Sequence, residues 1–229
     1  MKLGERLQAI AVFAAGGGPV ADIGTDHAYL PIYLVLHDYV SKAIAVEVKE
    51  GPYQAARDMI ERSNLAKQID LRFGNGLEPL RVGEADTVTI AGMGGATIVD
   101  ILNARPAVTA SIKRLVLQPM IAAGTLRRWL AANGWSIIDE TLVVDEGRLY
   151  EIIAAEPGRS AEFEDILYEI GPVLWAKRSP LLERHIDQLL SNIERILEEM
   201  TQSPTAIQSL RYEELSRRKL ALEEKRKCL

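Results

Sequence analysis

Short apolar runs alternate with longer amphipathic stretches from Leu3 to about Pro157, and this alternation constrains the fold more than any other feature of the chain. Each run is partly β-branched and bounded by glycine, aspartate or proline, which is typical of a buried strand. The predicted strands span residues 20–23, 43–46, 69–73, 87–90 and 115–117. The predicted helices between them span residues 30–38, 52–63, 96–102 and 124–133. Strands that alternate with helices in this way indicate a parallel sheet covered on both faces.

Two further strand-like runs follow the last of these helices, at residues 135–144 and 149–155. Only the turn at 145–148 separates them, which predicts a β-hairpin. The sheet is therefore expected to end in an antiparallel pair. A mostly parallel, Rossmann-like sheet with an antiparallel end strand is usual in class I methyltransferases, whereas a dinucleotide dehydrogenase normally keeps its sheet parallel.

The remainder of the chain has a helical pattern. A Pro- and Gly-containing stretch at 156–160 predicts a boundary between a domain at 1–157 and a C-terminal domain at 158–229. Within the second domain, apolar residues recur at spacings of three and four from Leu182 to Met200, and Ser203-Pro204 separates them from a second apolar stripe. The pattern predicts a helical hairpin that resembles a coiled coil. Packing of its two helices on each other explains the stripes most simply, so we expect a monomer; a dimer seam is the alternative.

Composition points to a folded cytoplasmic protein. No apolar run approaches the roughly 20 residues of a membrane helix, and the first residues lack the pattern of a signal peptide. The single cysteine, Cys228, and three scattered histidines provide no disulfide framework and no metal-ligand spacing, so no metal is expected.

The net charge of −5 does not favour a nucleic-acid partner, but binding depends on local patches rather than on the whole chain. Two basic clusters, at 217–219 and 225–227, are such candidates. Neighbouring glutamates make a solvated, ion-paired helix face the simpler interpretation.

The segment Val20-Ala21-Asp22-Ile23-Gly24-Thr25-Asp26-His27 places a strand, a carboxylate and a glycine turn before a helix. Gly24 allows the backbone to approach a ligand at the carboxyl end of the first strand. Asp26 would repel a pyrophosphate, but it would favour a sulfonium with an α-amino group, and the Gly-x-Gly-x-x-Gly spacing is absent. The segment therefore predicts S-adenosylmethionine rather than NAD. An ordinary strand-to-helix turn capped by Thr25 or Asp26 is the alternative.

Other predicted cofactor contacts follow the next strands. Glu47 ends the second strand, where a carboxylate can hold ribose hydroxyls, and Asn75 follows the third, where an amide can bind adenine. A solvent-facing strand end and a plain turn are the alternatives at these two places. The complete predicted cofactor set is Asp22, Gly24, Asp26, His27, Glu47, Val48, Asn75, Gly76, Ala91, Gly92, Met93 and Gly94.

The acceptor side is less defined. The turn Gly92-Met93-Gly94-Gly95 after the fourth strand lacks the Asn/Asp-Pro-Pro-aromatic pattern of adenine-N6 and cytosine-N4 methyltransferases. Gln118, at the end of the fifth strand, and Tyr150, at the start of the last, are candidate substrate ligands. A purely structural role is an equal alternative for both.

Three blocks resemble the bacterial tRNA (adenine-22-N1)-methyltransferase family, and with the N-terminal segment and the C-terminal helices the resemblance covers essentially the whole chain. The blocks are Asp22-Ile23-Gly24-Thr25-Asp26-His27-Ala28-Tyr29-Leu30-Pro31, Ala91-Gly92-Met93-Gly94-Gly95 and Leu117-Gln118-Pro119. The resemblance implies methyl transfer from S-adenosylmethionine to N1 of adenine 22 in tRNA, with Arg6, Asp26 and His27 facing the acceptor as catalytic residues. Asn75, where many methyltransferases have aspartate, and Met120, where a polar residue is expected, depart from the pattern.

Three alternatives remain at this stage. A methyltransferase of another RNA base or of a small molecule would use the same fold. A nicotinamide-dependent oxidoreductase would need a loop that accepts pyrophosphate, which Asp26 opposes. A non-catalytic binding module would not need an intact set of cofactor contacts such as Asp22, Gly24, Asp26 and Glu47.

Overall fold

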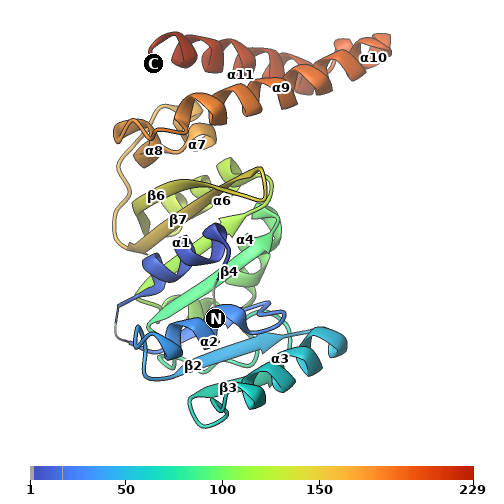
Figure 1. Cartoon of the computed structure of the whole chain (residues 1–229). Coiled ribbons are helices and arrows are strands. Elements are labelled where there is room, and N and C mark those ends of the chain that lie inside the picture. The colour runs from blue at the N-terminus through green and yellow to red at the C-terminus, as the bar shows by residue number, and fades with distance from the viewer. Residues whose placement is uncertain (1–2, 17) are drawn as a thin grey trace. The chain divides into compact units, whose positions relative to one another are not determined.

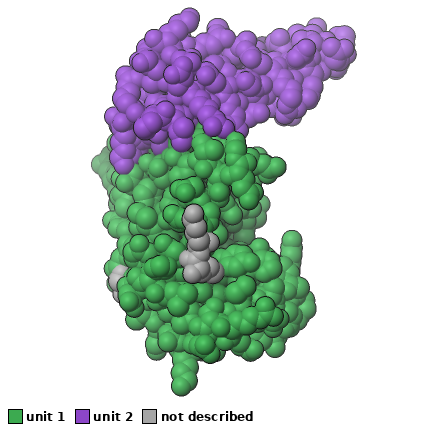
Figure 2. All heavy atoms as spheres, viewed as in Figure 1, with its two compact units in different colours: residues 1–162 green, residues 163–229 purple. Residues whose placement is uncertain are grey.

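The computed structural model describes residues 3–16 and 18–229. The chain divides into two compact units, residues 1–162 and residues 163–229 (Figure 2). The first unit is an α/β unit and the second is helical (Figure 1). The division lies five residues beyond the end of the last strand at Pro157.

A seven-stranded sheet forms the centre of the first unit, in the order β3-β2-β1-β4-β5-β7-β6 (Figure 1). The strands are β1 (Val20–Ile23), β2 (Ala43–Glu47), β3 (Ile69–Phe73), β4 (Thr87–Met93), β5 (Arg114–Pro119), β6 (Trp135–Asp145) and β7 (Arg148–Pro157). β1 to β5 pair in parallel, and β7 pairs antiparallel with both β5 and β6. The predicted fold class, a Rossmann-like sheet with an antiparallel end strand, is confirmed.

The register brings the carboxyl ends of the central strands to one edge. Ile23 of β1 lies beside Val46 of β2 and Ile90 of β4, and Ile90 lies beside Leu117 of β5. Because the strand order reverses between β1 and β4, the crossovers on the two sides of this point run on opposite faces of the sheet. The edge at this reversal is where an open α/β sheet binds its ligand.

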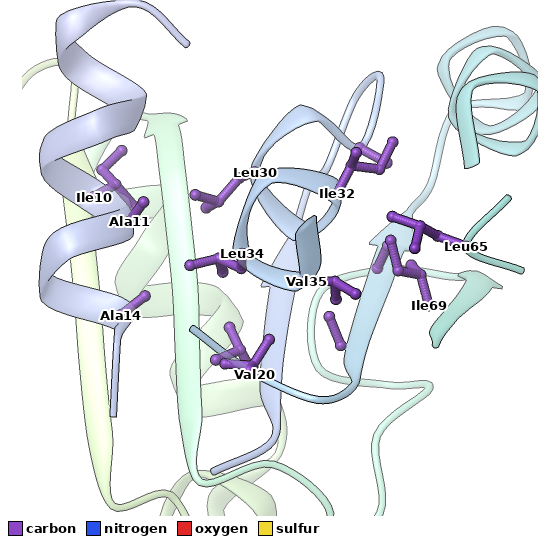
Figure 3. Packing of buried hydrophobic residues seen from close by; sticks show 14 of the residues in the cluster. Ile10, Ala11, Ala14, Val20, Leu30, Ile32, Leu34, Val35, Leu65 and Ile69 are labelled. Carbon is purple, nitrogen blue, oxygen red and sulfur yellow. The ribbon is translucent and has the colours of Figure 1, made fainter. Parts of the chain in front are cut away.

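Three helices share one apolar core on one face of the sheet: α1 (Glu5–Ala14), α2 (Tyr29–Leu36) and α3 (Glu50–Arg62). Ile10 and Ala11 of α1 face Leu30 and Leu34 of α2, with Val20 of β1 below them (Figure 3). The other helices of this unit are α4 (Gly95–Ala104), α5 (Pro106–Thr109) and α6 (Ala123–Ala132). α4 packs against β4, β5 and α6.

Helix α1 was not among the predicted elements. Its residues contact β4, β5, β6, β7 and α2, so that one short helix spans much of one sheet face. Ile10, Ala11 and Ala14 are buried, while Val12 is exposed between them. The helix positions the residues at its N-terminus above the end of β5.

The second unit contains α7 (Asp165–Ile170), α8 (Pro172–Ala176), α9 (Leu182–Thr201), α10 (Pro204–Ile207) and α11 (Leu210–Lys227). The contacts between α9 and α11 form the expected helical hairpin. The second long helix begins later than Pro204: α10 ends at Ile207, and Ser209 caps α11 by accepting a hydrogen bond from the Tyr212 N–H (3.2 Å).

Most cations of the two basic clusters form ion pairs within the second unit. Arg218 pairs with Glu169 and Glu214, Lys219 with Glu194 and Glu223, Lys225 with Glu164, and Arg226 with Glu183 and Asp187. Among the described residues of this unit, Arg178, Arg211, Arg217 and Lys227 form no ion pair, and Arg178 instead donates to the Cys228 carbonyl (3.0 Å) and lies over the Trp175 ring. These pairs support the interpretation of the clusters as an ion-paired helix face.

Across the described part of the chain, no helix is both long enough and apolar enough to cross a membrane.

Candidate functional site

A cavity of about 560 Å³ lies at the carboxyl ends of β1, β2 and β4. Its volume is within the range of sites for small-molecule cofactors. The predicted site residues that line it are Arg6, Asp22, Gly24, Asp26, Glu47, Val48, Ala91, Gly92 and Met93. It also has wall residues that were not predicted: Leu7, Thr25, Tyr29, Leu30, Lys49 and Pro52.

The turn between β1 and α2 has an unusual backbone. Gly24 has a φ of +73°, and Asp26 and Ala28 have left-handed φ values of 54° and 56°. A Cβ on Gly24 would lie 2.3 Å from the Met93 methyl carbon, so a side chain would press into the cavity wall. Left-handed backbone at non-glycine residues is costly and tends to occur at functional sites. The turn brings the Asp26 carboxylate to the cavity, where its side chain is mostly exposed.

Asp22 is a buried carboxylate at the back of the cavity. It accepts hydrogen bonds from the hydroxyls of Thr25 (2.7 Å) and Thr89 (2.6 Å). Burial raises the pKa of the Asp22 carboxyl above its ordinary value of 3.8, while the two hydroxyls oppose this shift. These bonds tie β1 and β4 to the turn at Thr25, so Asp22 also fixes the shape of the cavity.

Glu47 is buried at the end of β2 and is held by three backbone N–H groups. One carboxylate oxygen accepts from Val48 and Lys49 (both 2.9 Å), and the other accepts from Asp26 (3.1 Å). A carboxylate has about four acceptor positions, so this one retains capacity for a ligand hydroxyl. The three bonds fix its orientation toward the cavity.

Arg6 reaches the cavity from α1. Its Nη1 donates to Oε1 of Gln118 (2.8 Å), and its guanidinium lies 5.5 Å from the centre of the Tyr150 ring. The same Gln118 oxygen accepts from the Gly92 N–H (3.2 Å). Gln118 is fully buried, so its amide joins α1, the end of β4 and the end of β5 rather than facing solvent.

The remaining predicted residues lie outside the cavity lining. His27 stacks on Tyr29, with 5.3 Å between the ring centres, and its Nε2 lies 3.7 Å from an Asp26 carboxylate oxygen. Asn75 is exposed, and Gly76 is buried with a φ of +53° beside Ile101. Gly94 precedes α4 and lies next to Ile121.

No cluster of three or more histidine, cysteine, aspartate or glutamate side chains that could hold a metal ion occurs among the residues that the structure describes.

A family model described as "TrmK: tRNA (adenine(22)-N(1))-methyltransferase" matches residues 20–224 of this chain. The chain belongs to this family. The match confirms the resemblance drawn from the three sequence blocks, and it extends through the helical unit to within a few residues of the end of the chain.

Individual members of the tRNA (adenine(22)-N(1))-methyltransferase family are similar over nearly the whole chain. The Bacillus subtilis tRNA (adenine(22)-N(1))-methyltransferase is 40% identical over 208 residues, which are 89% of this chain and 87% of that protein. The crystal structure of the B. subtilis M1A22 tRNA methyltransferase TrmK superimposes with a TM-score of 0.88 at 37% identity and covers 98% of each chain. A Streptococcus pneumoniae protein, Sp1610, in complex with S-adenosyl-L-methionine, has a TM-score of 0.87 at 33% identity and covers 98% and 99% of the two chains.

Two residues that support the site in this family member were not found from the sequence. Thr25 and Thr89 hold Asp22, and both are buried. Thr25 stood within the segment singled out for its glycine turn, but Thr89 lies in an apolar strand with no local sign of function. Only the pairing of β1 with β4, which sets Asp22 opposite Thr89, brings that hydroxyl to the carboxylate.

Proposed function

We propose that this protein transfers a methyl group from S-adenosylmethionine to N1 of adenine 22 in tRNA. The observation that carries the proposal is the cavity at the strand-order reversal, which is lined by the fixed carboxylate of Glu47 and the exposed carboxylate of Asp26. Membership of the tRNA (adenine(22)-N(1))-methyltransferase family supports the acceptor. The solved complex of Sp1610 with S-adenosyl-L-methionine supports the cofactor.

The residues present fit this cofactor. Gly24 and Gly92 have positive φ and open backbone at the cavity, where added side chains would occupy ligand space or be strained. The fixed carboxylate of Glu47 is suited to accept hydrogen bonds from ribose hydroxyls. The Asp26 carboxylate favours a cationic sulfonium or ammonium group and disfavours a pyrophosphate. We infer that Glu47, Val48 and the two glycines hold the cofactor, with Asn75 and Gly76 near its base.

S-adenosylmethionine, when bound, supplies an activated methyl group on a sulfonium centre. Adenine N1 carries a lone pair, so the acceptor needs orientation rather than prior deprotonation. The methylated ring is cationic, and a nearby carboxylate stabilises it. We assign this role to Asp26, with His27 at 3.7 Å available to share a proton released from the exocyclic amino group.

We infer that Arg6 is a positioning residue, which fixes the cavity wall at the end of β5 through its bond to Gln118. A guanidinium beside the product ring would repel the positive charge that develops there, which argues against direct stabilisation. Instead, its bond to Gln118 and its position over the Tyr150 ring hold the guanidinium against the end of β5 and the start of β7. Tyr150 would then act through Arg6 at the acceptor side.

The helical unit is the proposed second contact with tRNA, in a domain of residues 158–229 that complements the catalytic domain of residues 1–157. Arg178 forms no ion pair but is held by the Cys228 carbonyl and the Trp175 ring, so the other cations without ion pairs, Arg211, Arg217 and Lys227, are those available to phosphates. Replacing all three with alanine should lower the slope of log affinity against log salt by about one per lost phosphate contact. Arg195→Ala is the control, because Arg195 pairs with Glu199 in the same unit. A slope unchanged in the triple variant would refute this contact.

A tRNA substrate also supports a cytoplasmic location, and the packing of α9 on α11 supports a monomer.

The decisive experiment is transfer of labelled methyl from S-adenosylmethionine to unmodified tRNA, followed by nucleoside analysis. We expect 1-methyladenosine, lost in Asp26→Ala but kept in Asp38→Ala. Asp38 is the matched control because it is also an exposed aspartate with left-handed backbone, at the end of α2. Unlabelled tRNA together with a labelled small-molecule acceptor would refute the proposed substrate and favour the alternative methyltransferase.

A further inference from the structure

The segment that follows β5, Met120 to Ala122, is held by hydrogen bonds against the turn that follows β4. The Met120 N–H donates to the Met93 carbonyl, and the Gly95 N–H donates to the Ile121 carbonyl, each at 2.8 Å. A Cβ on Gly95 would lie 2.3 Å from the Ala122 carbonyl oxygen, so only glycine permits this approach. The backbone of the segment is therefore held rigidly beside Met93, which lines the cavity.

This rigid segment presents two large apolar side chains to solvent. Met120 is 46% exposed and Ile121 is 73% exposed, directly after a strand whose last five residues are buried. The Gln118 amide donates to the Met120 sulfur (3.5 Å), which orients that side chain. Ile121 lies over Gly94, whose added Cβ would be 3.5 Å from the Ile121 Cγ1. Two adjacent apolar side chains that are exposed on a fixed backbone indicate a binding surface, whereas a single exposed apolar residue does not.

The position of this pair separates it from the cofactor side of the cavity. Glu47 lies on β2, whereas Met120 and Ile121 follow β5, and β1 and β4 stand between them in the sheet. A ligand that extends from Glu47 across Gly24 and Gly92 therefore points toward the β5 side, where Met120 and Ile121 lie beside Met93 of the cavity lining. That side is the acceptor side of the site.

We propose that Met120 and Ile121 form the apolar surface against which the unpaired acceptor adenine rests. The inference rests on the proposed function, because N1 lies on the pairing edge and the base must leave its stack to react. An unstacked base requires a new apolar contact, which is often an aromatic ring. The turn Gly92-Met93-Gly94-Gly95 has no aromatic residue, and Tyr29, the aromatic side chain in the cavity lining, stands at the start of α2, after β1. On the β5 side, Met120 and Ile121 supply the contact.

The test compares Ile121→Ser and Met120→Ser with the wild-type protein in methyl transfer to a tRNA transcript with adenine at position 22. We expect kcat/KM for tRNA to fall about tenfold in each, mainly through KM, because a base contact is lost. The Kd for S-adenosylmethionine and the melting temperature should stay unchanged. Ile121→Leu should retain near wild-type kinetics. Val82→Ser is the matched control, since Val82 is 62% exposed and precedes the amino end of β4, whereas Met120 and Ile121 follow the carboxyl end of β5.

The two proposals fail in different ways. A wild-type protein that forms no 1-methyladenosine would refute the proposed function. A wild-type protein that forms 1-methyladenosine, with both serine variants within twofold of it in kcat/KM for tRNA, would overturn the apolar surface alone. An equal rise in the Kd for S-adenosylmethionine would also overturn it, because the pair would then belong to the cofactor side.

Discussion

Removing the hydrogen bonds of Gln118 should release the Arg6 side chain from the end of β5 without changing the volume of the core. In Gln118→Met the side chain keeps its approximate size, but it no longer accepts from Arg6 (2.8 Å) and Gly92 (3.2 Å). A hydrogen bond to a charged group contributes about 1.5–3 kcal/mol, and a buried N–H left without a partner costs about 1–3 kcal/mol. Gln118 is fully buried, but Arg6 is only partly buried and Gly92 is exposed, so water in the cavity can replace part of each bond and the loss should lie near the lower end of these ranges.

The part of this loss that acts through Arg6 should appear in catalysis. About 1.5–3 kcal/mol corresponds to a fall of about tenfold to a hundredfold in kcat/KM for tRNA. Gln118→Glu retains acceptor oxygens for Arg6 and Gly92, but it cannot donate to the Pro119 carbonyl (3.0 Å) or the Met120 sulfur (3.5 Å), so it should recover only part of the activity. Arg6→Ala should lower kcat/KM by a similar factor.

A double-mutant cycle decides whether the two residues act together. We expect the Arg6→Ala, Gln118→Met double variant to be no slower than the slower single variant, because each substitution removes the same contact. Steady-state kinetics with tRNA and denaturant unfolding of all four proteins supply the measurements. Additive losses, or Gln118→Met with kcat/KM within threefold of the wild type, would refute the positioning role.

Three further variants test the cavity wall, the buried carboxylate behind it and a buried ion pair of the first unit. Gly24→Ala should raise the Kd for S-adenosylmethionine at least tenfold, because its φ of +73° costs a side chain about 1–2 kcal/mol and the Cβ collides with Met93 in the cavity wall; calorimetric titration measures this, and an unchanged Kd contradicts it. Asp22→Asn should flatten the pH dependence of stability. The pKa of Asp22 is raised in the folded chain, so the unfolded chain ionises first and wild-type stability falls as pH rises from about 3.8 through the raised value. Urea unfolding at several pH values shows whether the variant loses that slope. Arg127→Met should lower the free energy of unfolding by about 3–5 kcal/mol, since it removes a fully buried guanidinium that pairs with Glu140 and Glu151 (both 2.6 Å); a loss below about 1 kcal/mol would contradict this.

The strands of the sheet could be predicted because burial on both faces makes them continuous apolar runs. β1 and β2 are buried at every residue, and all of their residues except Asp22 and Glu47 are apolar. Helix α1 gave a weaker signal. It buries Ile10, Ala11 and Ala14 yet exposes Val12, so its apolar residues do not form a single clean stripe.

The site was predictable where the chemistry belongs to one turn and less so where it depends on distant contacts. The carboxylates of Asp26 and Glu47 follow directly from their places at strand ends, and the structure brings both to one cavity. Gln118 also stands at a strand end, so the sequence favours an open ligand contact there. Its burial depends on Arg6, which is 112 residues away in the chain, and no local pattern reports such a partner.

The Arg6 to Gln118 contact also sets an order for the assembly of the protein during synthesis. Helix α1 leaves the ribosome before β5, so its contact with β5 forms only after residue 119 has emerged. β7 must then pair beside β5 to complete that side of the sheet. Contacts of such long sequence separation form late because a long loop must close first. The nascent chain can therefore build the β1, β2 and β3 half of its sheet while the acceptor side of the cavity is still open.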